Sequence, residues 1–431
     1  MKPLIFFSLA LVVIFTSCNN DKKKIVDAAF IDSLLSNYTT PVVLKSNADE
    51  ASFWKNRIDP KNSGFVNETK YAAAMAARFA LTGDINDLII SDSVLKKVDE
   101  VYGHKEAGPI ASLAVHAISQ HRFKEADSLL TAAKKIGLKP FESLVYSFDV
   151  DFELGRIDQA GLELSSIRSS NDYPYYFRKS KLAHYRGNLD TSIASMLKAA
   201  DLAGTNDNLK QAALTNAADL YIHAGKLNEA YELYKKCITL NPADMHSISG
   251  IGWIALVHDK NDSLAQKIFE FVHTKTKLPD PLFKLAQTAE ARGDSNAAKI
   301  FAERFVQVAT DTAYGNMYNK YLVELFTGIL NDPAKAELIA RKELLNRATP
   351  QTYAWFVWTL FSNHKQEEAY RNYEKYVSGK PLEGLELYYI GKLMHGLKKG
   401  YNAKEFFKAA YKNKYDLSPA KVRELEKYLE E

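Results

Sequence analysis

Cysteine is scarce in this sequence. The 431 residues include only Cys18 and Cys237. Cys18 belongs to a modification motif described below, which leaves Cys237 without a cysteine partner and excludes an intramolecular disulfide. A chain without disulfides must be stabilised by its core, and a hydrophobic content of 46% over this length is enough to build a large one.

Long hydrophobic runs are also missing beyond the first residues. The longest candidate, "YAWFVWTLF" (Tyr353–Phe361), is far shorter than the ~20 apolar residues of a bilayer-spanning helix and suits a buried helix. We therefore expect the chain after its N-terminus to be soluble. The formal net charge of +4 is small for this length and gives no reason to expect a nucleic-acid partner.

The sequence lacks the common catalytic signatures. HExxH, GxSxG and the phosphate-binding GxxxxGK[ST] motif are absent, and no two of the ten histidines lie four residues apart. Cys237 is predicted to be a small core residue. Gly252 and Trp253, within "GIGWIA", are predicted to pack helices. We therefore expect no catalysis, no cofactor and no bound metal.

The N-terminal residues carry an export signal. In "MKPLIFFSLALVVIFTSC" a basic residue, Lys2, precedes an apolar run of about 12 residues. Two small residues then stand before Cys18, which resembles the lipobox of bacterial lipoproteins, although Phe15 stands where that family most often has leucine. The resemblance implies a signal peptide over 1–17 and a lipidated N-terminus and tether over 18–48. The alternative is a plain signal peptide with an incidental cysteine.

Strand patterns are nearly absent, and a repeated helical frame is present instead. In "GKLNEAYELYKKCITLNP" (Gly225–Pro242), Ala230 is followed by Tyr234 and Cys237, four and seven residues later. A small residue at Ala230 allows two helices to approach, and the bulky residue one turn later fills the layer between units. The proline ends the second helix before the next unit begins.

The same frame recurs along the chain at intervals of 32 to 38 residues. A weaker copy, with Leu88 in the alanine position, precedes the others. The equivalents of Ala230 are Ala126, Ala160, Ser192, Ala265, Ala298, Ala336, Ala369 and Ala403. The frame resembles the tetratricopeptide repeat, a helix–turn–helix unit of 34 residues.

This resemblance implies an all-α fold. We expect a right-handed superhelical solenoid of about ten helical hairpins over residues 69–417. Residues 49–68 are expected to form an N-terminal capping helix and loop. Residues 418–431 begin with Ser418 as N-cap and Pro419 at the first helical position, and are expected to form a polar C-terminal capping helix.

In tetratricopeptide arrays the first helices line a concave groove in which partners commonly dock. The resemblance places these residues in it: Phe177, Lys181, His184, Tyr185, Asp219, His223, His258, Phe283, Gln287, Glu290, Tyr318, Tyr321, Trp358, Tyr388, Lys392 and His395. Such a mixture suits peptide or glycan recognition; the alternative is that many pack against neighbouring helices. The three histidines in similar register do not predict a metal site, because first helices lie roughly 10 Å apart.

Together these features predict an exported, lipid-anchored scaffold or adaptor that binds a protein or peptide partner in its groove. The membrane is reached through the N-terminal lipid, and we expect the outer membrane rather than the inner one. One alternative is a glycan- or solute-binding lipoprotein that serves an outer-membrane transporter. The short repeat intervals leave little room for the loop-rich insertions such proteins usually carry. An enzyme is the second alternative, and it lacks a nucleophile–base pair.

Overall fold

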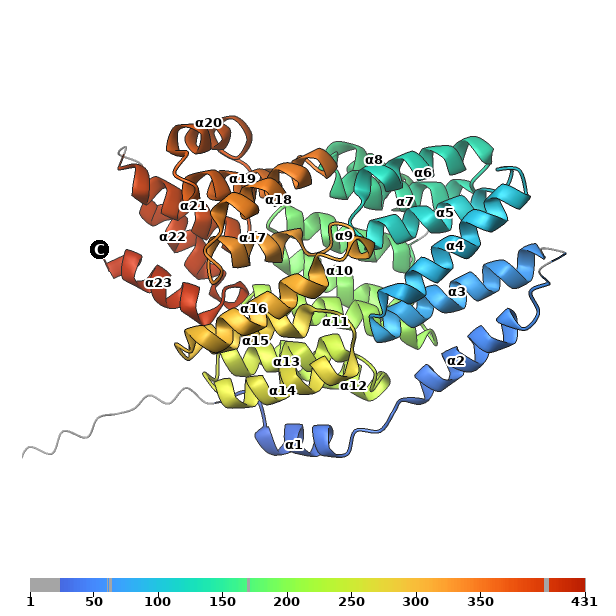
Figure 1. Ribbon diagram of the computed structural model, residues 1–431, viewed down its shortest axis with the longest axis horizontal. Helices are drawn as coiled ribbons and strands as arrows, with labels where there is room; N and C mark the ends of the chain where they lie inside the picture. Colours follow the sequence, from blue (N-terminus) through green and yellow to red (C-terminus); the bar gives the residue numbers. More distant parts are fainter. Residues whose placement is uncertain (1–23, 60, 62–63, 169–170, 399–402, 431) are drawn as a thin grey trace, which may run out of the picture.

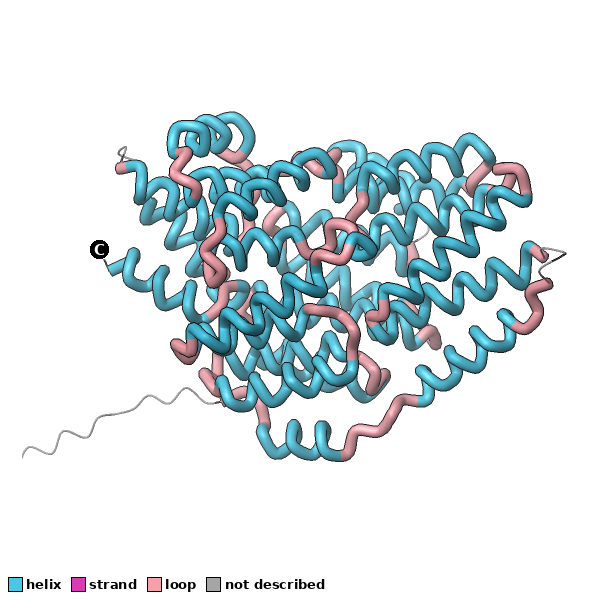
Figure 2. The backbone as a smooth tube through the Cα atoms, in the orientation of Figure 1, coloured by secondary structure: helices cyan, strands magenta, loops and turns pink. Residues whose placement is uncertain are grey.

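The computed structural model describes residues 24–59, 61, 64–168, 171–398 and 403–430. Within these residues the chain forms 23 α-helices, two short 3₁₀ helices and no β-strand (Figures 1 and 2). None of the described helices is both long and apolar enough to cross a bilayer. The predicted signal peptide and Cys18 lie outside the described residues.

The described residues contain ten antiparallel hairpins in sequence order, which confirms the predicted all-α superhelical array. The hairpins are α3/α4 (Phe65–Thr82, Ile85–Val101), α5/α6 (Ala107–Ser119, Phe123–Ile136), α7/α8 (Pro140–Glu153, Ile157–Ile167), α9/α10 (Tyr173–Tyr185, Leu189–Leu202), α11/α12 (Asp207–His223, Leu227–Leu240), α13/α14 (Met245–Val257, Asp262–Lys275), α15/α16 (Asp280–Ala291, Ser295–Ala309), α17/α18 (Asn319–Thr327, Pro333–Asn346), α19/α20 (Pro350–Ser362, Gln366–Tyr376) and α21/α22 (Gly384–Leu397, Ala403–Lys412).

The predicted alanine position explains how each hairpin closes. From Ala126 to Ala369 every residue in this position is at most 2% exposed, and so is Leu88 in the weaker copy. Ala403 is the exception, because it opens α22 and is only partly buried. Its helix still buries Phe407 and Ala410 in the slots four and seven residues later. The frame read from the sequence therefore gives the packing face of the second helices.

The array is closed by contacts between its two halves. We call α3–α12 the N-terminal layer and α13–α23, including α23 (Pro419–Glu430), the C-terminal layer. Loops inside N-terminal hairpins lie on loops between C-terminal hairpins. The backbone N–H of Lys277 donates to Thr82 O at 2.9 Å, and that of Asn316 donates to Gln120 O at 2.9 Å. The superhelix therefore stacks on itself, and the groove between the layers is enclosed.

Glycine allows one of these close approaches. Gly83 has φ +72°, and a Cβ atom there would lie 2.4 Å from Leu278 Cγ. Asn346 bonds the layers further along, where its Oδ1 accepts from Phe123 N at 3.0 Å and its Nδ2 donates to His121 O at 2.7 Å. These contacts join residues more than 190 positions apart, so no local sequence pattern predicts them.

The N-terminal segment differs from the expected tether. Its described part forms α1 (Ala28–Ser36) and the start of α2 (Val42–Lys55). Ile31 is fully buried against the hydrophobic cluster of α12–α14, while α2 packs on α3. In Figure 1 this segment runs along one side of the molecule from α14 to α3. The helix expected within 49–68 is therefore the second half of α2, which begins at Val42 and ends at Lys55.

The C-terminal helix begins where predicted. Ser418 is buried, and its Oγ accepts from Lys421 N at 3.4 Å at the start of α23. The helix packs on α22 and also reaches α15. Before it, the 3₁₀ helix η3 (Lys414–Asp416) contacts α11. This end of the chain does more than cap the array, because it also ties the C-terminal layer to the N-terminal one.

Candidate functional site in the enclosed groove

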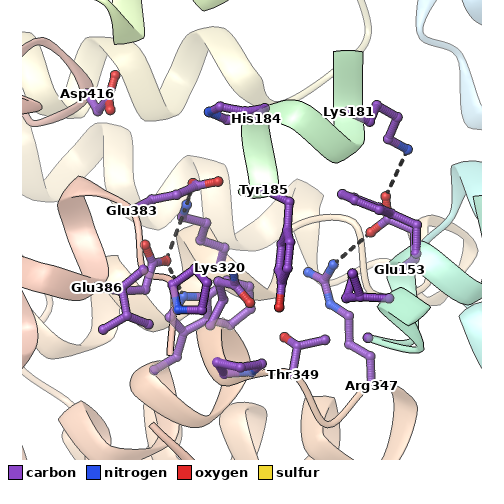
Figure 3. A pocket seen from close by; sticks show the side chains of 18 of the residues that line it. Glu153, Lys181, His184, Tyr185, Lys320, Arg347, Thr349, Glu383, Glu386 and Asp416 are labelled. Atoms are coloured by element: carbon purple, nitrogen blue, oxygen red, sulfur yellow. Dashed lines mark hydrogen bonds and ion pairs between the residues drawn. The ribbon is translucent and has the colours of Figure 1, made fainter. Parts of the chain in front are cut away.

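A cavity of about 640 Å³ lies where the two layers separate. Gly155, Arg186, Gly187 and Leu189 line its N-terminal-layer side, and Pro381 and Leu382 line the facing loop. A Cβ atom on Gly155 would lie 3.2 Å from Thr349 Cγ2, whereas one on Gly187 would meet nothing within 4 Å. We call this space the joint cavity, and Figure 3 shows its side chains.

One wall of the joint cavity is a chain of charges that crosses between the layers. Lys181 Nζ lies 3.2 Å from Glu153 Oε1, and Arg347 Nη1 lies 3.2 Å from Glu153 Oε2 (Figure 3). Arg347 Nε also lies 2.8 Å from Glu343 Oε1. Burial raises the pKa of Glu153, but Lys181 and Arg347 outweigh it and hold the pKa below its usual value. The carboxylate therefore stays charged and holds both cations in place.

The opposite wall centres on Lys320 of α17. Its Nζ lies 3.4 Å from Glu386 Oε1 and 3.8 Å from Glu383 Oε2. Burial lowers the pKa of Lys320, but these two carboxylates outweigh it and raise the pKa above its usual value. The Glu386 side chain is fully buried and also accepts from Trp355 Nε1 at 2.7 Å. This wall thus presents a fixed ammonium beside an indole ring.

A histidine pair joins this cavity to a second one. His223 Nδ1 lies 2.7 Å from Asp416 Oδ1, and the ring centroids of His184 and His223 are 5.0 Å apart. Burial lowers the pKa of His223, but the hydrogen bond and charge of Asp416 raise it to about 9. Burial and the charge of His223 lower the pKa of His184. At neutral pH His223 is therefore cationic and His184 neutral.

The second space, the inner cavity, has a volume of about 430 Å³. It adjoins the joint cavity and shares with it the residues His223, Lys320, Tyr321, Glu383 and Asp416. Among its own residues, the ammonium of Lys284 lies 3.6 Å from the centre of the Trp253 ring. Burial lowers the pKa of Lys284 to about 8, against the opposing charge of Glu324.

Asp219 forms the other polar centre of the inner cavity. It accepts from Tyr234 Oη at 2.6 Å, and His246 Nε2 lies 3.0 Å from its Oδ2. The charge of Asp219 raises the pKa of His246 to about 9. Burial raises the pKa of Asp219, but His246 and Tyr234 outweigh it and lower the pKa overall. Both cavities are thus lined by ionised side chains whose positions are set by one another.

The comparisons with known proteins match this architecture. A family model described as tetratricopeptide repeat matches residues 212–244. These residues cover most of α11, all of α12 and the loop to α13. The chain therefore contains a tetratricopeptide repeat. No curated protein sequence matches it.

Several solved structures are similar to the repeat protein at low identity. PilF of Pseudomonas aeruginosa is 12% identical with a TM-score of 0.36, and the match covers 51% of this chain and 97% of that one. A tetratricopeptide repeat protein from Parabacteroides merdae is 16% identical with a TM-score of 0.35, covering 60% and 99%. Yeast Tom70 is 14% identical with a TM-score of 0.35, covering 84% and 95%.

The tetratricopeptide frame brings about half of the predicted groove residues to the cavities. Those that line a cavity are Lys181, His184, Tyr185, Asp219, His223, Phe283, Gln287 and Tyr321. Those that line neither are Phe177, His258, Glu290, Tyr318, Trp358, Tyr388, Lys392 and His395. Whether any of them binds a partner stays a prediction.

Some residues of the second group are core rather than groove. Trp358 is 7% exposed and stacks on Tyr389, with 4.9 Å between ring centroids. Tyr318 is buried and donates to Asp280 Oδ2 at 2.9 Å, and Tyr388 is buried and donates to Glu424 Oε2 at 2.5 Å. In this array, positions that would face an open groove are covered by neighbouring helices.

Other cavity residues were not predicted from the sequence. Glu153 ends a first helix, Arg347 lies between hairpins, and Lys320, Glu383 and Asp416 come from the C-terminal layer. The repeat frame assigns groove positions within one unit and its neighbours. It carries no signal for a loop five hairpins away that folds back over the groove.

Metal and thiol chemistry were also considered at these residues. His184 and His223 lie closer together than the expected helix spacing suggested, but His223 already bonds Asp416. In the part of the chain that the structure describes, no group of three or more histidine, cysteine, aspartate or glutamate residues could hold a metal ion. Cys237 is fully buried, and burial raises the pKa of its thiol.

Proposed function

We propose that this tetratricopeptide repeat protein is an exported scaffold that holds a segment of a protein partner in the enclosed groove. The observation that carries the proposal is the joint cavity, which both layers line with ionised and aromatic side chains. Its volume of about 640 Å³ lies within the range of roughly 300–1,000 Å³ that binding pockets occupy. Solenoids commonly use such concave surfaces for binding.

A peptide segment fits the chemistry of the walls better than an apolar ligand does. Tyr185, Tyr321 and Trp355 offer rings on which apolar side chains can pack. Lys320 and Arg347 present charge at fixed positions between them. A peptide carries apolar side chains together with donors, acceptors and charges, so it can use both kinds of group.

The proposal also includes an anchor at Cys18. The lipobox-like residues before it support this part, since acyl chains contribute about 0.8 kcal/mol per buried CH₂ and hold a protein at a bilayer. Cys18→Ser should move the protein to the soluble fraction and abolish incorporation of labelled fatty acid. Retention at the membrane without label would contradict the lipid anchor.

Photo-crosslinking tests the groove. A photoreactive phenylalanine analogue at Tyr185, which lines the joint cavity, should give adducts with one protein partner in cells. The matched control is the same analogue at Phe141, an exposed aromatic residue outside both cavities. We expect at least tenfold more adduct from position 185. Equal yields at both positions, or adducts with a glycan or small solute alone, would contradict a protein partner.

A further inference from the structure

The first described residues are clamped to one point of the array. The backbone N–H groups of Ile25 and Val26 donate to the two carboxylate oxygens of Asp259, at 2.9 and 2.8 Å. The Asp259 side chain is 1% exposed, and His258 Nδ1 lies 2.8 Å from its Oδ1. Asp27 N also donates to Tyr231 Oη at 3.2 Å. We call this set of contacts the clip.

Hydrophobic packing reinforces the clip on its C-terminal side. Val26 is 6% exposed and Ile31 is fully buried in the cluster that includes Tyr231. Lys267 Nζ lies 2.7 Å from Asp32 Oδ1 on the surface of the same region. The chain entering the array is thus fixed by a carboxylate with both oxygens engaged and by buried apolar side chains.

The clip lies at one end of the molecule. Asp259 belongs to the loop inside hairpin α13/α14, and the loops inside the other C-terminal-layer hairpins point the same way because their first helices run side by side. The α15/α16 loop marks this end at the left of Figure 1, opposite the α4/α5 loop at the right. We call it the end face; its described loop residues are 258–261, 292–294, 328–332, 363–365 and 398.

The loops of the end face carry slightly more cations than carboxylates. Lys24, Lys260, Arg292, Lys365 and Lys398 are exposed there, and two of them are paired: Arg292 Nε lies 3.7 Å from Asp262 Oδ2, and Lys365 Nζ lies 2.7 Å from Glu337 Oε1. The aspartates of the same loops are engaged by the backbone. Asp294 Oδ1 accepts from Ala297 N at 3.0 Å, Asp332 Oδ1 accepts from Lys335 N at 3.1 Å, and Asp259 is held in the clip.

The clip also limits how far the array can lie from Cys18. Ile25 lies seven positions after Cys18, and a fully extended chain covers at most about 3.5 Å per residue, or about 25 Å in all. The stretch includes the lysine run at positions 22–24. A lipid on Cys18 would therefore hold the clip, and the loops beside it, close to the bilayer.

We propose that the end face rests on a bilayer surface carrying anionic headgroups, with the clip fixing that orientation. The inference rests on the acylation of Cys18 proposed above. The C-terminal layer then holds the groove away from the bilayer, because the N-terminal layer stacks on the far side of the C-terminal layer. Basic side chains near an anionic surface favour this arrangement.

Fluorescence quenching in vesicles tests the orientation. The acylated protein carries a single fluorophore on Ser295→Cys or Gln366→Cys, both exposed beside end-face loops, or on Lys105→Cys in the α4/α5 loop. The native Cys237 is fully buried, and the unsubstituted protein controls for its labelling. With vesicles containing phosphatidylglycerol and headgroup-spin-labelled lipid, we expect at least twofold quenching at positions 295 and 366 and none at 105.

The clip is tested in the same assay with a matched pair of variants. Asp259→Asn leaves one acceptor oxygen for two N–H donors, so quenching should become similar at both ends. Asp294→Asn lies on the same face outside the clip and keeps an N-cap side chain, so it should leave the difference unchanged. Circular dichroism should be the same for both variants.

The outcomes separate the two proposals. Acylated, vesicle-bound protein with equal quenching at positions 105, 295 and 366 would overturn the orientation and leave the anchor standing. A persistent difference in the Asp259→Asn variant would show that the clip does not set the orientation. Absence of fatty acid on Cys18 would overturn the anchor and this inference with it.

Discussion

At the residue scale, ion pairs fix the positions of the charged side chains that line the groove. His223 and Asp416 show how this couples folding to pH. The folded pKa of His223 is about 9, above the ordinary value of 6.5. A raised pKa contributes stability that is complete below pH 6.5 and is lost as pH rises through about 9. The pair joins α11 to η3, so this stability belongs to the contact between the layers.

Asp416→Asn should remove this contribution. We expect the variant to lose about 2 kcal/mol of unfolding free energy at pH 6, which is within the range for a charge-assisted hydrogen bond. The difference in unfolding free energy between the variant and the parent protein should narrow as pH rises from 6.5 to about 9. Urea unfolding at several pH values measures it.

The control is Asp190→Asn, which removes an ion pair with Lys226. The Asp190 side chain is 91% exposed. Exposed pairs contribute little, so this variant should follow the parent protein at every pH. If Asp416→Asn lowers the unfolding free energy by the same amount at every pH from 6 to 10, the raised pKa of His223 does not explain the loss.

At the element scale, hairpins pack through glycines in first helices as well as alanines in second helices. A Cβ atom on Gly250 of α13 would lie 2.4 Å from the Tyr234 ring of α12. One on Gly391 of α21 would lie 2.6 Å from Phe407 of α22. Both rings occupy the slot four residues after the alanine position. The ring of the second helix thus requires a helical glycine opposite it.

Gly250→Ala should therefore destabilise the protein by about 1–3 kcal/mol, because the added methyl group overpacks the helix contact. Gly108 of α5 is the matched control, since a Cβ atom there meets nothing within 4 Å. Gly108→Ala should leave stability unchanged or slightly raised, because alanine favours helix. Thermal unfolding of both variants checks this, and equal midpoints would mean that Tyr234 moves aside freely.

At the scale of the whole molecule, stacking of the two layers turns an open array into an enclosed one. Gly83 and Gly103 allow this to be tested with little else changed. Both have positive φ, +72° and +63°, so alanine strains the backbone similarly at each. Only at Gly83 does the added Cβ meet the other layer, at 2.4 Å from Leu278.

Gly83→Ala should push the layers apart locally, while Gly103→Ala should not. We expect a larger radius of gyration for Gly83→Ala by small-angle X-ray scattering, with the helical signal of both variants retained. Both should lose about 1–2 kcal/mol from backbone strain, and Gly83→Ala about 1–3 kcal/mol more from the clash. Identical scattering curves for the two variants would contradict a tight contact between the layers.

The sequence by itself determined the repeating unit. Hairpin packing depends on residues within one 34-residue frame, so Ala230, Tyr234 and Cys237 reveal the helix, its buried face and its period. The C-terminal helix could also be predicted from local sequence, because Ser418 is a favoured N-cap residue and Pro419 is favoured at the first helical position. Helix α1 was missed because its buried residue, Ile31, packs against α12–α14, far along the chain.

Only the tertiary structure decided the closure of the array and the composition of the cavities. Glu153 meets Arg347 across 194 positions, and His223 meets Asp416 across 193. Small changes in the rotation between successive hairpins accumulate along a solenoid, so no single unit specifies which loops meet one turn later. For this reason Tyr321 lines a cavity, while Trp358, chosen by the same frame, is buried against Tyr389.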